Sequence, residues 1–148
     1  MILNRQRSVR VPAKDLNRFL SRARRTLRLP VESVSVCLVS NSEMARWNRA
    51  YRGQAGPTDV LSFRVGEADK RRRRFFALHD TSARYLGDIA IAPAVARRNA
   101  LRFGRTFSQE MRILMLHGML HLMGYDHETD NGQMDRREQR LRRTLGLA

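Results

Sequence analysis

The sequence predicts a single domain that contains both helices and strands, and three observations support this prediction. The chain has 148 residues, which is the size of one ordinary domain. Its hydrophobic residues, 42% of the total, fall in separated stretches, some with the period of a strand and others with the period of a helix. No repeat, linker or low-complexity segment divides the chain. A second domain is therefore not expected.

The first part of the chain predicts a helix, a strand and a second helix. Apolar residues recur at helical spacing over residues 11–29 and predict an amphipathic helix there. Small polar and apolar residues alternate over 33–40, as they do in a half-buried strand. Asn41 or Ser42 is placed to cap a short second helix, which the turn residues from Gly53 onwards end.

A second strand is predicted over 59–65 (DVLSFRV), with successive side chains on opposite faces. Residues 66–83 have the period of neither a strand nor a helix, and they contain the basic run from Lys70 to Arg74. We expect an exposed loop or hairpin there. Such a run is usually a solvated loop. The alternative is that Arg71–Arg74 contact the phosphate groups of a nucleic acid.

The second half of the chain predicts a third strand and two flanking helices. The strand covers 86–92 (LGDIAIA), and Pro93 then opens a helix that continues to Gly104. A last helix is expected to start at Thr129 or Asp130, with an apolar stripe beneath many arginines.

The most apolar helix is predicted over residues 106–123. Thr106 and Gln109 have the spacing of a capping box at its start. The positions that follow are almost wholly apolar, so this helix must be buried. Gly124 is placed to end it.

Arginine dominates the charged residues. The chain has 29 basic residues, 27 of them arginine, and a formal net charge of +15. Guanidinium groups bind phosphate bidentately and stack on bases, so nucleic acid is the leading partner. A GC-rich coding bias, which favours arginine codons, is the alternative explanation. No apolar run is long enough for a membrane span or a signal peptide, so we expect a cytoplasmic protein that does not bind membranes.

Three of the four histidines are spaced as metal ligands. His117 and His121 are four residues apart, so on a helix both can point from one face toward a single ion. Gly124 lets the chain reverse, and His127 can return as a third ligand. A zinc ion with three histidine ligands keeps one position open for water, whose pKa it lowers to about 7. We therefore predict one catalytic Zn²⁺ per chain, and we expect the fourth histidine, His79, to be exposed.

The same histidine spacing occurs in metzincin proteases, which carry a catalytic Glu directly after the first histidine. Gly118 occupies that position here, so a protease would lack its general base. A glycine inside a helix costs about 1 kcal/mol relative to alanine, and two explanations for it remain open. Gly118 either lets a substrate or another backbone approach the metal, or it allows tight packing of the helix.

Four segments resemble the YbeY family of bacterial endoribonucleases, also called rRNA maturation factors. They are HGMLHLMGYDH at 117–127, TDVLSF at 58–63, LGDIAI at 86–91 and NRAYRG at 48–53. The resemblance spans most of residues 33–146. Two positions depart from the family pattern. Arg64 stands where relatives usually have a proline, and Gln54-Ala55-Gly56 replaces residues that are often charged.

The resemblance implies an α+β fold, in which about five helices surround a small mixed sheet of about four strands and the metal site lies on a buried helix. It implies that residues 1–148 form a single zinc-dependent endoribonuclease domain. The implied activity is single-strand-specific cleavage of RNA in 16S rRNA 3′-end maturation and ribosome quality control. RNA and the ribosome or its small-subunit proteins are the expected partners, and DNA is not.

The resemblance also implies that Arg52 is a catalytic residue in the cleft. A permanently charged fork beside the metal can hold the scissile phosphate and stabilise charge that develops during in-line attack. The attacking group is either a water activated by zinc or a ribose 2′-OH, and the general base is not identified. Asp126 is a candidate to orient a ligand histidine or relay a proton, and a purely structural role in the turn is the alternative.

Two other functions remain as alternatives. One is a ribosome assembly factor without enzymatic activity, in which the zinc is only structural. The other is a metzincin-like metallohydrolase, which the glycine at position 118 disfavours. Nickel or another divalent ion is an alternative occupant of the three-histidine site.

Overall fold

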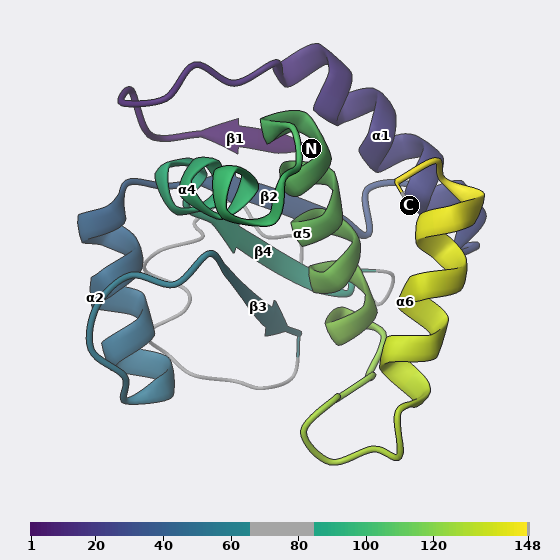
Figure 1. Cartoon of the computed structure of the whole chain (residues 1–148). Helices are drawn as coiled ribbons and strands as arrows, with labels where there is room; N and C mark the ends of the chain where they lie inside the picture. Colours follow the sequence, from purple (N-terminus) through teal and green to yellow (C-terminus); the bar gives the residue numbers. More distant parts are fainter. Residues whose placement is uncertain (66–84, 148) are drawn as a thin grey trace.

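A mixed four-stranded sheet with helices packed on both faces forms the protein (Figure 1). The computed structural model describes residues 1–65 and 85–147. The α+β fold that the sequence led us to expect is confirmed. The elements in this part of the chain are β1 (Ile2–Asn4), α1 (Ala13–Thr26), β2 (Val34–Leu38), α2 (Asn41–Arg52), β3 (Val60–Arg64), β4 (Gly87–Ile91), α4 (Pro93–Phe103), α5 (Phe107–Leu122) and α6 (Gln133–Thr144).

The strands lie in the order β1-β2-β4-β3. Strands β1, β2 and β4 are parallel, and β3 is antiparallel to β4. All five residues of β4 are buried because this strand lies inside the sheet and is covered on both faces. Strand β1 was not predicted, since three residues at the start of the chain are too few to show a period.

Alternate side chains of the sheet enter two separate cores. Residues Val36, Ile89 and Ile91 pack with α1, α5 and α6 on one face. Residues Cys37 and Ala90 pack with Trp47 of α2 on the opposite face, together with Leu61 and Phe63 of β3. The predicted alternation along β3 is therefore confirmed, with Leu61 and Phe63 buried, Val60 and Ser62 half-buried, and Arg64 exposed.

Helix α5 is the buried helix that the sequence predicts. The capping box at its start is present, because the Gln109 backbone N–H donates to Thr106 Oγ1 at 3.1 Å and the Thr106 N–H donates to Gln109 Oε1 at 2.9 Å. The helix contacts β3, β4, α1, α4 and α6. It therefore holds its C-terminal turn, with two of the three histidines, in a fixed position against the sheet.

Two predicted helix starts are wrong by a few residues. The cap of α2 is Ser40, whose hydroxyl accepts from the Glu43 backbone N–H at 3.2 Å, rather than Asn41 or Ser42. Helix α6 starts later than Thr129 or Asp130. A turn comes first, and the Asp130 carboxylate reaches forward to accept the Met134 N–H at 2.9 Å, inside the first turn of α6.

The predicted loop over 66–83, with its basic run from Lys70 to Arg74, the candidate phosphate contacts Arg71–Arg74 and His79, lies outside the described residues. Among the helices that are described, none is long and apolar enough to cross a membrane.

The contacts that a Cβ atom would make at position 118 explain why a glycine is found there. A Cβ at this position would lie 2.8 Å from Ile89 Cγ2 and 2.9 Å from Ile89 Cδ1, so α5 packs directly on β4 here. The Gly118 carbonyl also accepts a hydrogen bond from Ser62 Oγ of β3 at 3.3 Å. Of the two explanations, tight packing of the helix is confirmed.

Gly118→Ala is expected to destabilise the fold. The added methyl group overfills the contact with Ile89, at a cost of about 1–3 kcal/mol, which outweighs the gain of about 1 kcal/mol in helix propensity. Thermal unfolding should show a melting temperature lower by several degrees. In an Ile89→Ala background the same substitution should cost nothing further. An unchanged melting temperature for the single variant would contradict the packing explanation.

Candidate metal centre

The three predicted histidines meet at the C-terminal end of α5. His117 and His121 lie one turn apart on that helix, and His127 lies in the loop between α5 and α6. One ring nitrogen from each histidine lies within 4.8 Å of the others, and the Nε2 atoms of His117 and His121 are 3.1 Å apart. The chain therefore brings together residues that are ten positions apart in sequence.

A tight turn returns His127 to the helix end. Gly124 adopts a φ of 103°, a conformation that favours glycine, and its N–H donates to the His121 carbonyl at 3.0 Å. The Asp126 carboxylate accepts the Glu128 backbone N–H at 3.0 Å within the same loop. This bond gives Asp126 a structural role in the turn, and its predicted role toward a ligand histidine stays a prediction.

The three nitrogens fit a divalent metal ion. Two histidine nitrogens bound to one tetrahedral zinc are separated by roughly 3.3 Å, which is close to the 3.1 Å observed for His117 and His121. Burial, together with the charges of the two neighbouring histidines, lowers the pKa of His121 below its ordinary value. A lowered pKa keeps the imidazole neutral at pH 7, and the neutral form is the one that binds metal. The site can therefore hold a metal ion.

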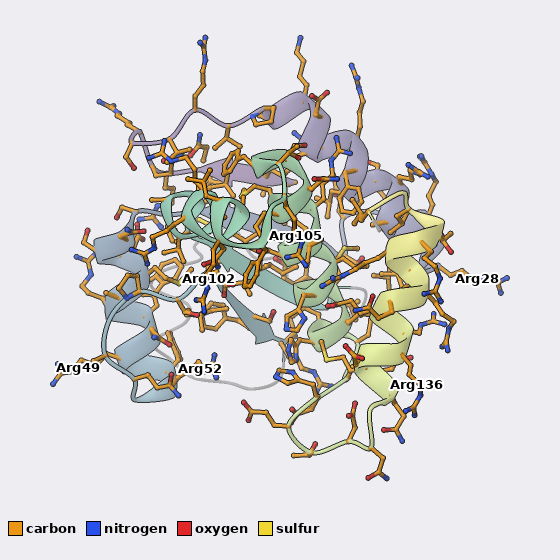
Figure 2. The ribbon with its side chains drawn as sticks, in the orientation of Figure 1. Arg28, Arg49, Arg52, Arg102, Arg105 and Arg136 are labelled. Atoms are coloured by element: carbon orange, nitrogen blue, oxygen red, sulfur yellow. The ribbon has the colours of Figure 1, made fainter. Side chains whose placement is uncertain are left out.

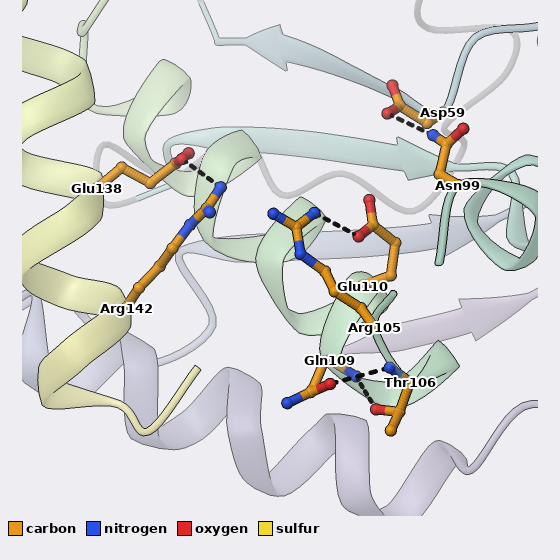
Figure 3. A network of polar contacts seen from close by, with 8 residues as sticks. All are labelled: Asp59, Asn99, Arg105, Thr106, Gln109, Glu110, Glu138 and Arg142. Atoms are coloured by element: carbon orange, nitrogen blue, oxygen red, sulfur yellow. Dashed lines mark hydrogen bonds and ion pairs between the residues drawn. The ribbon is translucent and has the colours of Figure 1, made fainter. Parts of the chain in front are cut away.

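One residue that orients this site was not predicted. Glu138 of α6 is buried, and its carboxylate lies 2.7 Å from His117 Nδ1 and 2.7 Å from Arg142 Nη2 (Figure 3 shows the Glu138–Arg142 pair). A carboxylate that accepts a hydrogen bond from Nδ1–H leaves Nε2 of the same ring free to face the metal position. Burial disfavours the charged form of Glu138, but the hydrogen bond and charge of His117, together with Arg142, keep its pKa below the ordinary value.

The sequence did contain a signal for Glu138. The apolar stripe of the last helix comprises Met134, Leu141 and Leu145, and Glu138 stands at a position of this stripe where another apolar residue is expected. A carboxylate on the buried face of a helix needs a partner. Its partner lies on a different helix, so the period alone does not identify it.

The three histidines line a cleft with a volume of about 520 Å³. Figure 2 shows Arg52 at the C-terminal end of α2. Arg52 lines this cleft, and its Nη2 lies 3.8 Å from Glu128 Oε1. Both side chains are largely exposed, so this ion pair contributes little stability and leaves the guanidinium available to an anion. Arg64 also lines the cleft and adds a second arginine.

Asp59 also lines the cleft and is fixed by two hydrogen bonds. Its Oδ1 accepts the Val60 backbone N–H at 2.8 Å, and its Oδ2 accepts from Asn99 Nδ2 of α4 at 3.2 Å (Figure 3). The cleft therefore lies between α2, β3, the end of α5 and the loop with His127, and α4 adjoins its rim.

The fold and the site define a small α+β protein with three histidines that could hold a metal ion, in a cleft whose lining includes two arginines. The family model for endoribonuclease YbeY matches residues 1–146, and the chain belongs to the YbeY family. It is 41% identical over 122 residues to the endoribonuclease YbeY of Roseiflexus sp. strain RS-1, covering 80% of this chain and 73% of the relative.

Two further relatives extend the match over nearly the whole chain. The endoribonuclease YbeY of Koribacter versatilis is 37% identical over 147 residues, which are 99% of this chain and 86% of the relative. The solution structure of TM1509 from Thermotoga maritima is similar with a TM-score of 0.61 and 26% identity, over 98% of this chain and 89% of that one. The sequence comparisons therefore show the family, and the structural comparison shows a similar fold over nearly the whole chain.

Proposed function

We propose that this chain is a zinc-dependent, single-strand-specific endoribonuclease that acts in 16S rRNA 3′-end maturation and ribosome quality control. Residues 1–148 form its single catalytic domain, and it works in the cytoplasm with the ribosome or small-subunit proteins as partners. The family membership supports cleavage of RNA. The three-histidine site beside two arginines supports a metal-assisted reaction at a phosphate.

The main support for this proposal is that, among the described residues, the site offers a metal ion only three protein ligands. In the part of the chain that the structure describes, no fourth histidine, cysteine or carboxylate joins the group formed by His117, His121 and His127. A structural zinc takes four protein ligands, whereas a catalytic one takes three and keeps one position for a reacting group. The site also faces a cleft instead of the core. An assembly factor with a purely structural zinc is therefore not favoured.

Three residues at or near the histidines have distinct tasks in the proposed reaction. When bound, the zinc ion would act as a Lewis acid on the phosphate group. Arg52 binds the scissile phosphate and stabilises negative charge that develops on its oxygens. Glu138 accepts a hydrogen bond from Nδ1–H of His117 and so fixes the orientation of the ring. Asp126 shapes the loop that presents His127.

Replacing Glu138 should weaken metal binding without abolishing it. Loss of a carboxylate that orients a ligand histidine typically costs about 10- to 100-fold in metal affinity. Glu138→Gln keeps an acceptor for His117 Nδ1 and should lose less than Glu138→Ala. Competition against a chromogenic chelator measures the affinity. Asp135→Ala, which removes an exposed carboxylate from the same helix, is the matched control. Equal affinity for Glu138→Ala and the control would contradict the proposed orientation of His117.

The substrate class is tested by cleavage of matched oligonucleotides. Purified protein is incubated with one sequence as single-stranded RNA, as an RNA duplex and as single-stranded DNA, with and without a chelator. We expect cleavage of the single-stranded RNA alone, and its loss with chelator. Cleavage of the duplex at the same rate, or cleavage that survives metal removal, would overturn the proposal.

A further inference from the structure

Helix α4 ends in an aromatic side chain that is exposed. Phe103 is its last residue, and 55% of its surface is accessible to solvent. Gly104 follows with a φ of 66° and turns the chain away. Single exposed apolar residues are common on protein surfaces, so exposure alone gives this side chain no function. The residues that surround Phe103 do indicate a function.

Two guanidinium groups lie against the Phe103 ring. The Arg102 Cζ is 5.6 Å from the ring centroid, and the Arg105 Cζ is 5.2 Å from it, both within the range of a cation–π contact. Arg105 is held in place by Glu110, whose buried carboxylate accepts from Arg105 Nη1 at 2.9 Å (Figure 3). The aromatic ring is therefore exposed to solvent beside two positive charges, and the buried Glu110 carboxylate holds one of them in place.

This patch, which comprises Arg102, Phe103 and Arg105, lies one helical turn from a residue that contacts the lining of the cleft. Asn99 and Phe103 are four residues apart on α4, so they lie on one face of the helix, one turn from each other. Asn99 donates its Nδ2 hydrogen to Asp59 Oδ2, and Asp59 lines the cleft with the histidines. Figure 2 shows Arg102, Arg105 and Arg52 in the same view of the molecule.

The charge of α4 selects the kind of partner. Its sequence, PAVARRNALRF, contains three arginines and no acidic residue, and all three arginines are exposed. An aromatic face flanked by arginines is the arrangement with which proteins bind single-stranded nucleic acid, because unpaired bases stack on the ring and phosphates pair with the guanidinium groups. In a duplex the base faces are already stacked on each other.

We infer that the patch of Arg102, Phe103 and Arg105 is a second contact site for the single-stranded RNA that is cut in the cleft. One unpaired base stacks on Phe103, and the two arginines bind the phosphates beside it. The strand continues past Asn99 and Asp59 to the three histidines. This inference rests on the proposed function, and it adds to it that the substrate must extend several nucleotides beyond the bond that is cut.

Binding of short and long strands tests the inference. The protein is treated with chelator so that no RNA is cut, and fluorescence anisotropy measures affinity for single strands of about 4 and about 16 nucleotides, the range of site sizes in proteins that bind by stacking. Phe103→Ala should weaken binding of the long strand by roughly 5- to 100-fold, the effect of one lost stacked base. Binding of the short strand, which the cleft alone accommodates, should not change.

Two further variants make the outcome specific. Leu101→Ala removes the most exposed apolar side chain of the same helix, accessible over 81% of its surface, and should bind both strands like the wild type. Phe103→Trp should retain the affinity for the long strand, and its indole fluorescence should change on binding, whereas the native Trp47 is fully buried. Arg102→Glu should weaken binding of the long strand and reduce its salt dependence.

Wild-type affinity of Phe103→Ala for the long strand, or an equal loss with Leu101→Ala, would overturn the inference. Because binding is measured without cleavage, an inactive but RNA-binding protein would refute the proposed function and leave this site standing. Intact cleavage with no difference between the strand lengths would refute the site alone.

Discussion

His121→Ala is expected to lose both the bound metal and RNA cleavage. His121 lies close to both other predicted ligands, with its Nε2 atom 3.1 Å from Nε2 of His117 and its ring centroid 5.4 Å from that of His127. Two remaining histidines would leave half of the positions of a tetrahedral zinc without a protein ligand, so binding should be weak. Alanine is a better helix former than histidine, so α5 should persist and the loss should not come from unfolding.

Three measurements on this variant separate loss of the site from loss of the fold. Elemental analysis should find less than one metal ion per ten chains, cleavage of single-stranded RNA should fall to the level of chelator-treated wild type, and circular dichroism should be unchanged. His79→Ala removes the histidine outside the predicted ligand set and should keep metal and activity. Stoichiometric metal in His121→Ala would show that the three histidines are not its ligands.

Arg52→Glu is expected to reduce cleavage by roughly 100-fold or more while the metal content stays at one ion per chain. Removal of a single group that stabilises charge in the transition state costs about 10²–10³ in kcat, and a carboxylate at the same place repels the phosphate as well. The structure places this guanidinium in the cleft but not among the metal ligands. Activity and metal binding should therefore separate in this variant.

Arg49→Glu is the matched control for Arg52→Glu. It makes the same charge change on the same helix, and Arg49 is exposed and lies outside the residues that line the cleft (Figure 2). Arg52→Lys keeps the charge but loses the bidentate fork, and it should fall between wild type and Arg52→Glu. If Arg49→Glu is as slow as Arg52→Glu, the effect is one of overall charge, and Arg52 has no special role.

Local patterns predicted most of the fold because they act within a few residues. The capping box of Thr106 and Gln109, the proline that opens α4 and the glycines that end α2 and α4 all work within one turn, and each is where the sequence placed it. The starts of α2 and α6 were misplaced because several neighbouring residues can act as caps. In such a run, the surrounding packing decides between Ser40 and Asn41.

The grouping of the three histidines was predictable for the same reason, since helical spacing and one glycine turn bring them together. The role of Glu138 and the patch around Phe103 could not be predicted from the sequence. The meaning of Glu138 depends on α6 packing beside α5, a contact between residues 21 positions apart. The exposure of Phe103 depends on how α4 lies over the sheet. Neither relation leaves a period or a motif in the sequence.

The central claim, that a metal held by the three histidines drives RNA cleavage, is tested most directly by titrating the metal back. Protein purified without a histidine tag is stripped with chelator and reloaded with zinc in steps, and cleavage of single-stranded RNA is measured at each step. The account predicts no cleavage by the stripped protein and a linear gain that ends at one ion per chain. Cleavage by the stripped protein at the full rate, or reloading to one ion per chain with no gain in cleavage, would contradict it.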